Sequence, residues 1–293
     1  MNLPHEQGSS LKKKSIAFQG EHGAYSEQAI RKLSEELPIT IPFRSFWEML
    51  KLVSEEKVDY AMLPVENSLA GTVIPAYDAL IESELFVHAE VMLRIEHCLM
   101  APEGLKIEDV RFVISHHQTL AQCSEHIEEE GKEAKEYYDT AGAARDLATS
   151  EMPFTAAIAS ELAAQTYGLN ILRRNFEDLE TNTTRFFLMG GEAMECSGEC
   201  KTSIIFTTEH SPGALFSVLG ELSNRGLNLT KIESRPFKKE MWHYLFFVDF
   251  EGSVSEKRVE EAVNAISSRC SYFKLLGSYR SANDLELNSN QLT

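Results

Sequence analysis

Basic residues are under-represented in this sequence. Its 28 Lys and Arg residues stand against 45 Asp and Glu residues, so the formal net charge is −17 over 293 residues. Because proteins that bind nucleic acids neutralise phosphates with clustered Lys and Arg, this balance argues against a nucleic-acid partner. Long apolar runs are missing too, since no stretch approaches the length of a membrane span. We therefore expect a cytoplasmic protein with no membrane partner.

Cysteine and the common cofactor loops are also scarce. The five cysteines, at positions 98, 123, 196, 200 and 270, are odd in number and contain no C-x-x-C pair. Cys196 and Cys200 are close enough in sequence to share a metal, but the pattern predicts neither a disulfide framework nor a paired zinc site. The GEHG turn at 20–23 lacks the third glycine of a dinucleotide loop, and no G-K-[ST] loop occurs. We expect reduced thiols, no metal, and no NAD, ATP or other cofactor.

The remaining composition, 43% hydrophobic and 25% charged, is that of an ordinary globular protein long enough for two domains. Residues 201–283 carry 11 Lys and Arg and 9 Asp and Glu, a net charge of +2, so the rest of the chain carries −19. This shift predicts a domain boundary near residue 200.

Strand and helix patterns alternate before that boundary, which is typical of an α/β fold. The first elements expected are strands at 15–20, 58–63 and 87–95, with helices at 25–33 and 74–81. The second of these strands should end at Pro64, before a turn-rich segment. The same rhythm continues in a second lobe, and two α/β lobes leave a cleft that suits a small ligand.

After residue 200 the pattern is that of one small domain. A strand at 202–208 precedes a helix capped by Ser211, with Pro212 in its first turn and an apolar stripe of Leu215, Phe216, Leu219 and Leu222. Strands at 228–234 and 242–250 flank a turn at 237–241, and a capping box at 253–256 opens a second helix before a strand at 273–279. The order βαββαβ predicts a ferredoxin-like domain.

Two segments combine groups that suit catalysis. NTTRFF, at 182–187, offers a hydroxyl to a leaving oxygen, a guanidinium to a carboxylate and aromatic walls to a ring, although it also fits a plain strand start. PVENS, at 64–68, follows a strand, where open α/β sheets place ligands, although it also fits a solvated turn.

Two further segments lie at strand-to-helix junctions. SHHQTLAQC, at 115–123, offers Ser115, His116 and Gln118, and its adjacent histidines should face different directions, which argues against a two-histidine metal site. DTAGAA, at 139–144, places Thr140 at a helix start that can meet an anion, or that is simply capped by Asp139.

Taken together and in order, these segments resemble the prephenate dehydratase family over about residues 15–280. The resemblance is carried by GEHGAYSEQA, AMLPVENSLAGTV, SHHQTLAQC, DTAGAA, AAIAS, YGLNIL, NTTRFF, PGALF and KIESRP, with His117 standing where the family usually has proline. It implies a catalytic region over 15–193, whose two α/β lobes are similar to those of periplasmic binding proteins, with the second lobe at about 97–170. It also implies a C-terminal ACT regulatory domain over 201–280.

The family's reaction converts prephenate to phenylpyruvate with loss of water and CO2, in L-phenylalanine biosynthesis, and needs no cofactor or metal. The resemblance implies that Thr184 assists the leaving hydroxyl, with Glu66 as a competing acid. Arg185 would then bind the pyruvyl carboxylate, because gripping the departing carboxylate would stabilise the ground state. Phe186 would support the ring. Further substrate contacts are expected from Asn67, Ser68, Ser115, Gln118, Thr140, Asn182 and Thr183.

The ACT domain implies feedback inhibition by L-phenylalanine and a homo-oligomer, dimer or tetramer, formed through paired ACT domains. The expected effector residues are Pro212, Gly213, Ala214, Leu215 and Phe216, with Glu233, Ser234, Arg235 and Pro236. Two alternatives stay open: an arogenate dehydratase, whose substrate carries an ammonium in place of the keto group, and a non-enzymatic amino-acid sensor.

Overall fold

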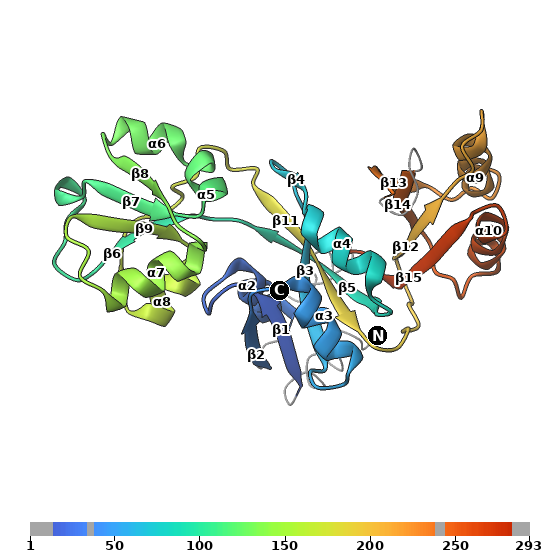
Figure 1. Cartoon of the computed structure of the whole chain (residues 1–293), viewed down its shortest axis with the longest axis horizontal. Coiled ribbons are helices and arrows are strands. Elements are labelled where there is room, and N and C mark those ends of the chain that lie inside the picture. Colours follow the sequence, from blue (N-terminus) through green and yellow to red (C-terminus); the bar gives the residue numbers. More distant parts are fainter. Residues whose placement is uncertain (1–13, 34–37, 238–243, 283–293) are drawn as a thin grey trace. The chain divides into compact units, whose positions relative to one another are not determined.

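The computed structural model describes residues 14–33, 38–237 and 244–282, which form two compact units (Figure 1). The first unit comprises the described residues up to Ala79 together with Val91–Phe186. The second comprises Leu80–Glu90 and the described residues from Phe187 onward. Within these residues no helix has the length and apolar character needed to cross a bilayer.

The first lobe of the first unit is built on a six-stranded sheet in the order β2-β1-β3-β11-β5, in which β1 pairs in parallel with β2 and β3, and β4 pairs antiparallel with β3. Ile16, Ala17 and Phe18 of β1 are fully buried in its core. The strands are β1 (Ser15–Gln19), β2 (Ile39–Phe43), β3 (Tyr60–Asn67), β4 (Gly71–Thr72), β5 (Phe86–Arg94) and β11 (Thr183–Gly190), and the helices are α2 (Tyr25–Leu33), α3 (Phe46–Ser54) and α4 (Ile74–Glu82).

This lobe corrects two expectations from the sequence. Strand β2 and helix α3 were not expected, and β2 tolerates Pro42 because it lies at the edge of the sheet. Strand β3 does not end at Pro64 but continues to Asn67. Its pairing with β1 reaches only to Met62, so the missing N–H of Pro64 interrupts no bond to β1.

The second lobe has a mixed sheet in the order β10-β6-β9-β7-β8. Small side chains let α7 lie close to this sheet, because Ala141, Ala143 and Ala144 pack with Ala157 and Ala159 of β9. The strands are β6 (Cys98–Ala101), β7 (Phe112–Ser115), β8 (Glu133–Glu136), β9 (Thr155–Ala159) and β10 (Asn170–Arg173), and the helices are η1 (Ile107–Asp109), α5 (His117–Gln122), α6 (Ser124–Glu129), α7 (Thr140–Thr149) and α8 (Glu161–Tyr167).

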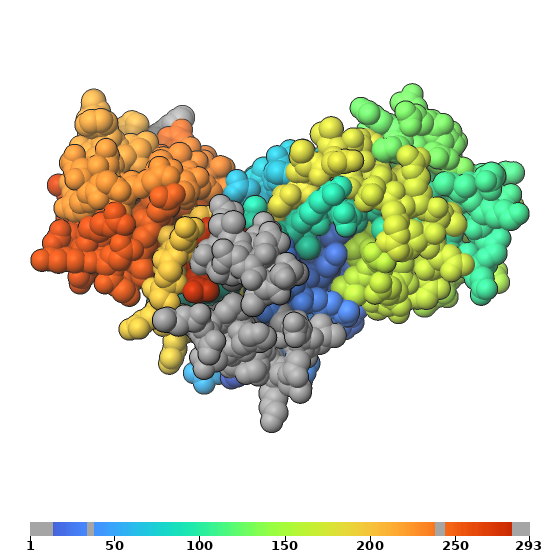
Figure 2. Space-filling view, turned by 180° about the vertical axis from the view of Figure 1, so that it is seen from behind, coloured from blue at the N-terminus to red at the C-terminus, as the bar shows by residue number. Residues whose placement is uncertain are grey.

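The second unit contains the expected βαββαβ domain, a four-stranded antiparallel sheet in the order β13-β14-β12-β15. Helices α9 and α10 cover one face of the sheet (Figure 1), and Val218 and Ile266 pack there against Phe250. The orange and red atoms of residues 200–280 gather into one body in Figure 2. Its elements are β12 (Cys200–Thr207), α9 (Ala214–Ser223), β13 (Leu229–Pro236), β14 (Tyr244–Glu251), α10 (Lys257–Ser267) and β15 (Tyr272–Arg280).

The start of α9 differs from the expectation. Ser211 does not cap the helix, which begins at Ala214 after Gly213, whose φ of +84° is easily adopted only by glycine. Phe216 does not belong to the buried stripe, since it is 80% exposed. The turn expected at 237–241 and the strand start at Trp242 lie mostly outside the described residues.

The capping box expected at 253–256 is only half formed. The Glu256 carboxylate accepts the backbone N–H of Ser253 at 3.0 Å, but Glu256 is itself the N-cap residue of α10 rather than its third helical residue.

The expectation of unpaired thiols was wrong at one place. Cys196 and Cys200 form a disulfide with their Cα atoms 6.2 Å apart. The turn between them contains Gly198 at a φ of +93°, which folds the chain back and brings the two cysteines within bonding range. The odd cysteine count concealed this pair because Cys98, Cys123 and Cys270 remain free.

Candidate active site

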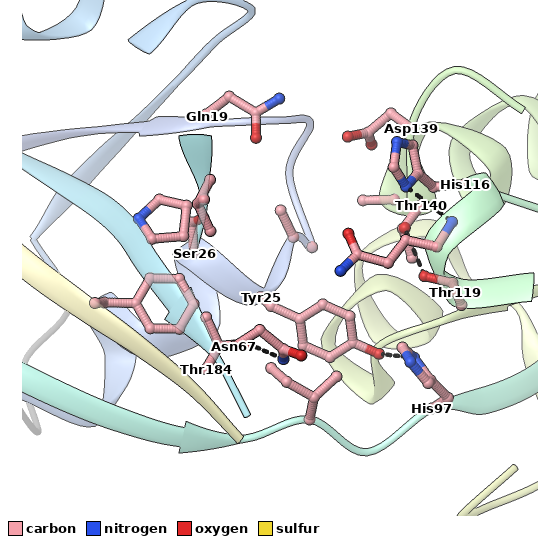
Figure 3. A pocket seen from close by; sticks show the side chains of 18 of the residues that line it. Gln19, Tyr25, Ser26, Asn67, His97, His116, Thr119, Asp139, Thr140 and Thr184 are labelled. Atoms are coloured by element: carbon pink, nitrogen blue, oxygen red, sulfur yellow. Dashed lines mark hydrogen bonds between the residues drawn. The ribbon is translucent and has the colours of Figure 1, made fainter. Parts of the chain in front are cut away.

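A cavity of about 260 Å³ is lined by both lobes of the first unit (Figure 3). The first lobe contributes Gln19 at the end of β1, Tyr25 and Ser26 at the start of α2, and Asn67 at the end of β3. The second contributes side chains from α5 and from the start of α7, including His116, Gln118, Thr119, Asp139 and Thr140. Strand ends and helix N-termini therefore meet here, the usual ligand position of α/β sheets.

Close packing of the lobes shapes one side of the cavity. Gly23 has a φ of +87°, and a Cβ atom built on it would lie 2.6 Å from the Cα atom of Ala163 in α8. Ser160 donates its hydroxyl hydrogen to the Gly23 carbonyl at 2.5 Å, and Arg145 of α7 lies 2.8 Å from Glu21. Only glycine at position 23 permits this approach.

Strand β11 divides the NTTRFF segment between two faces. Thr184 and Phe186 line the cavity, whereas Arg185 does not and is only 7% exposed. The guanidinium of Arg185 lies 3.8 Å from the carboxylate of Glu66, which also does not line the cavity. Successive side chains of a strand face opposite sides, and Glu66 belongs to β3 rather than to a turn. This geometry therefore does not support direct roles for Arg185 and Glu66 at the reacting atoms.

The expected substrate contacts also separate into two groups. Asn67, Gln118 and Thr140 line the cavity, but Ser68, Ser115, Asn182 and Thr183 do not. Ser115 is fully buried and donates to the carbonyl of Ile158 at 2.7 Å, which ties β7 to β9. Ser68 donates to the carbonyl of Thr181 and accepts the N–H of Thr183, so it joins the end of β3 to the start of β11.

Asn67 fixes the role of the Thr184 hydroxyl. Its Oδ1 atom accepts the backbone N–H groups of Leu69 and Ala70, at 3.0 and 2.9 Å. Its Nδ2 atom then donates to Thr184 Oγ1 at 2.9 Å and to Asn182 Oδ1 at 2.7 Å. Within the described part of the chain, no acceptor takes the hydroxyl hydrogen of Thr184. This hydrogen is available to a ligand in the cavity.

The cavity wall has little positive charge. Among the described residues that line it there is no Lys or Arg. Burial lowers the pKa of His97 and of His116, so both favour the neutral form, whereas burial raises the pKa of the Asp139 carboxyl. A bound anion must therefore be met mainly by hydroxyl, amide and backbone N–H groups.

The two adjacent histidines do not face different directions, because the rings of His116 and His117 lie 4.1 Å apart, centre to centre. Only His116 lines the cavity. Nowhere in the described ranges do three His, Cys, Asp or Glu side chains gather as metal ligands.

The two expected effector segments meet at one end of the second unit's sheet. Leu245 of β14 pairs with Thr207 at the end of β12 and with Arg235 of β13. The end of β12, from which the chain continues to Pro212–Phe216, therefore lies at the same end of the sheet as Glu233–Pro236, with β14 between them. Phe216, Ser234 and Pro236 are exposed, and Leu215 is partly buried against the domain core.

Several residues that line the cavity were not predicted from the sequence. A local sequence pattern could have indicated some of them but not others. Gln122 lines the cavity four residues after Gln118, so helical spacing places both on one face of α5. Gln19 is the last residue of the buried strand β1, and strand ends are another ligand position. His97, Tyr25 and Tyr138 carried no comparable signal.

Known proteins support a common ancestry over the whole described chain. Residues 16–194 match the family model described as prephenate dehydratase, and residues 202–268 match the ACT domain. Arogenate dehydratase 2 of Petunia hybrida is 38% identical over 291 residues, covering 94% of this chain and 73% of that protein.

Two solved structures are similar along nearly their full lengths. A prephenate dehydratase from Arthrobacter aurescens in complex with L-Phe is 29% identical, with a TM-score of 0.85, covering 95% of this chain and 97% of that one. GqqA, described as a novel type of quorum quenching acylase, is 34% identical, with a TM-score of 0.83, covering 92% and 98% of the two chains.

Proposed function

Because the chain belongs to the prephenate dehydratase family of hydro-lyases and carries an ACT domain, we propose that it converts prephenate to phenylpyruvate, water and CO2 in L-phenylalanine biosynthesis. The observation that carries this proposal is the Thr184 hydroxyl, which accepts from Asn67 and keeps its own hydrogen for a ligand. Phe186, on the same face of β11, supplies an apolar wall for a ring.

The reaction needs assistance mainly at one oxygen. As the ring carboxylate leaves as CO2, the electrons of its C–C bond enter the ring and expel the 4-hydroxyl, which takes up a proton to become water. Thr184 donates a hydrogen bond where negative charge develops on the departing oxygen. A hydroxyl that already accepts a hydrogen bond is a better donor, so the Asn67 amide strengthens this contact.

The substrate's carboxylates need partners other than basic side chains. The first turn of α2 borders the cavity, and its N–H groups and positive dipole end suit an anion, whereas the first turn of α7 is already capped by the Asp139 carboxylate. Ser26 lines the cavity from the first lobe, and Thr119 and Thr140, whose hydroxyl oxygens lie 3.2 Å apart, line it from the second lobe. Binding one carboxylate there leaves the other unrestrained for decarboxylation.

The test is turnover of prephenate, followed as phenylpyruvate formation, by the wild type, Thr184→Val and Thr184→Ser. Valine keeps the shape but removes the donor, so kcat should fall by about 10² to 10³, whereas serine should keep most of the rate. Thr183→Val is the matched control, because Thr183 does not line the cavity. Equal losses in Thr183→Val and Thr184→Val would contradict the assigned role.

Arogenate is a second candidate substrate, and Asp139 favours it. This carboxylate lies in a wall without Lys or Arg (Figure 3), and its Oδ1 atom accepts the N–H of Gly142 at 2.7 Å. An ammonium group would pair with it, whereas the keto group of prephenate cannot. Asp139→Asn preserves the helix cap but removes the charge. The kcat/KM ratio of arogenate to prephenate should then fall by about tenfold. An unchanged ratio would remove Asp139 from substrate selection.

Acyl-group hydrolysis, suggested by the name of one structural neighbour, has weaker support. An acylase of the hydroxyl type needs a base that removes the proton from its nucleophile. The partner of Thr184 Oγ1 is an amide donor, not a base. Incubation with an N-acyl amide should therefore leave that compound intact.

We further propose that the ACT domain binds L-phenylalanine as an inhibitor and joins copies of the protein into an oligomer. We place the L-phenylalanine site at the meeting of residues 212–216 and 233–236, between ACT domains of two copies. Strand β13 lies at the edge of its sheet and exposes Ile232. Tyr244, on the neighbouring strand β14, is also exposed. An exposed apolar edge of this kind suits pairing with a second copy. A cytoplasmic location remains part of the proposal.

A further inference from the structure

The hydrogen bonds around Thr184 continue into a longer buried chain. Asn182, which is fully buried, donates from Nδ2 to Gln122 Oε1 at 2.9 Å. The same oxygen lies 3.0 Å from His97 Nε2, and His97 Nδ1 lies 2.6 Å from the hydroxyl of Tyr25 (Figure 3). The chain therefore runs from Thr184 through Asn67, Asn182 and Gln122 to His97, joining both lobes of the first unit.

The direction of every bond in this chain follows from its fixed end. Backbone N–H groups can only donate, so the Asn67 atom that faces Leu69 and Ala70 must be oxygen. Asn67 then donates to Asn182, whose amide must in turn donate to Gln122. The Gln122 atom at this junction is therefore oxygen, and His97 Nε2 must carry a hydrogen.

We propose that His97, held as the Nε2–H tautomer, is a positioning residue that holds the Gln122 and Asn182 amides in place and so supports the Asn67 donor behind the Thr184 hydroxyl. Its Nδ1 atom, 2.6 Å from the Tyr25 hydroxyl, then accepts the hydrogen of that hydroxyl in competition with the carbonyl oxygen of Glu96 at 3.1 Å. The expected effect of His97 on kcat rests on the proposed dehydratase function, whereas the assignment of the tautomer does not.

The directions of these hydrogen bonds resist reversal, because reversal would leave buried donors facing one another. If His97 Nε2 lost its hydrogen and became an acceptor, Gln122 would have to turn its NH2 group toward it. That NH2 group would then also face the NH2 group of Asn182. Turning Asn182 and Asn67 in sequence would then set NH2 against two backbone donors. Buried donors without acceptors destabilise the folded protein, and His97 is only 1% exposed.

Two substitutions test the contacts of the two ring nitrogens of His97 separately. A glutamine amide nitrogen reaches the place of Nε2, so His97→Gln keeps a donor for Gln122. An asparagine amide reaches only the place of Nδ1, so His97→Asn keeps the Tyr25 contact and loses that donor. We expect kcat to fall about threefold or less in His97→Gln and about tenfold or more in His97→Asn, with KM nearly unchanged in both.

Equal kcat values in the two variants, or the reverse order, would overturn the proposal. The wild-type protein offers a second test that survives misfolding of either variant. In protein labelled with ¹⁵N-histidine, nitrogen shifts at about pH 8 should show His97 protonated at Nε2 and bare at Nδ1. A hydrogen on Nδ1 alone would overturn the proposal even if activity is normal. A wild type that turns over neither prephenate nor arogenate would instead defeat the proposed function and leave the tautomer test standing.

Discussion

Burial lowers the pKa of three histidines, His88, His97 and His116. Their pKa in the unfolded chain is about 6.5, so the unfolded state binds more protons than the folded state just below that pH. The stability they contribute is complete above pH 6.5 and is lost as the pH falls toward their folded values. The melting temperature should therefore decrease between about pH 7.5 and 5.5.

The contribution of His97 can be isolated by thermal melts over the same pH range. His97→Gln removes one of the three titrations, so its melting temperature should depend less steeply on pH than that of the wild type. An equally steep dependence would mean that His97 has the same affinity for protons in both states.

The sequence indicates some site residues and hides others for physical reasons. Thr184, Phe186, Asn67, Gln118 and Thr140 were predicted and line the cavity. Arg185 was grouped with them because it adjoins Thr184 in sequence, but strand geometry turns it to the other face, and Glu66, although it adjoins Asn67, does not line the cavity. Tyr25, His97 and Gln122 were missed because their meeting depends on how distant segments pack, which no local pattern records.

At the scale of elements, long periodic segments were predictable and short ones were not. The patterns at 25–33, 74–81 and 140–148 correspond to α2, α4 and α7. Strands β6 and β10 contain four residues each, too few to display a clear alternation, and β2 contains a proline. The turn expected at PVENS is strand because neighbouring strands supply pairing that the local sequence does not show.

The turn before α2 should be intolerant of even one added carbon. Gly23→Ala would place its Cβ atom against the backbone of Ala163, so the two lobes must separate. We expect KM to rise by about tenfold or more, in addition to a loss of stability of about 1 kcal/mol from the left-handed backbone. Steady-state kinetics and thermal melts measure the two effects.

Gly131→Ala is the matched control for this change. Gly131 also has a positive φ, +64°, but a Cβ atom there would meet nothing within 4 Å. It should show the backbone cost alone, with KM unchanged. A similar KM in the two variants would mean that the approach of the lobes does not shape the substrate site.

At the scale of the whole molecule, assembly should depend on the edge of the second unit's sheet. Ile232 on β13 is 42% exposed. Ile232→Lys would place a charge on the edge that a second copy is proposed to cover, so the oligomer should dissociate and inhibition by L-phenylalanine should weaken. Light scattering after gel filtration, with and without L-phenylalanine, gives the mass of the particle.

Ile39→Lys provides the comparison, since Ile39 is 62% exposed on β2, the edge strand of the other unit. Its mass and its inhibition should remain those of the wild type. If both variants keep the wild-type mass, the β13 edge is not the interface.

Strand β11 limits where insertions and deletions can occur in this sequence during evolution. Thr184 and Phe186 belong to the first unit, whereas Phe187 belongs to the second, where its ring lies 5.3 Å from that of Tyr279. Inserting or deleting one residue between Thr184 and Phe187 would invert every side chain on one side of the change. Length variation among descendants of this sequence should therefore be excluded from residues 184–187 and concentrate in the connection at 191–199.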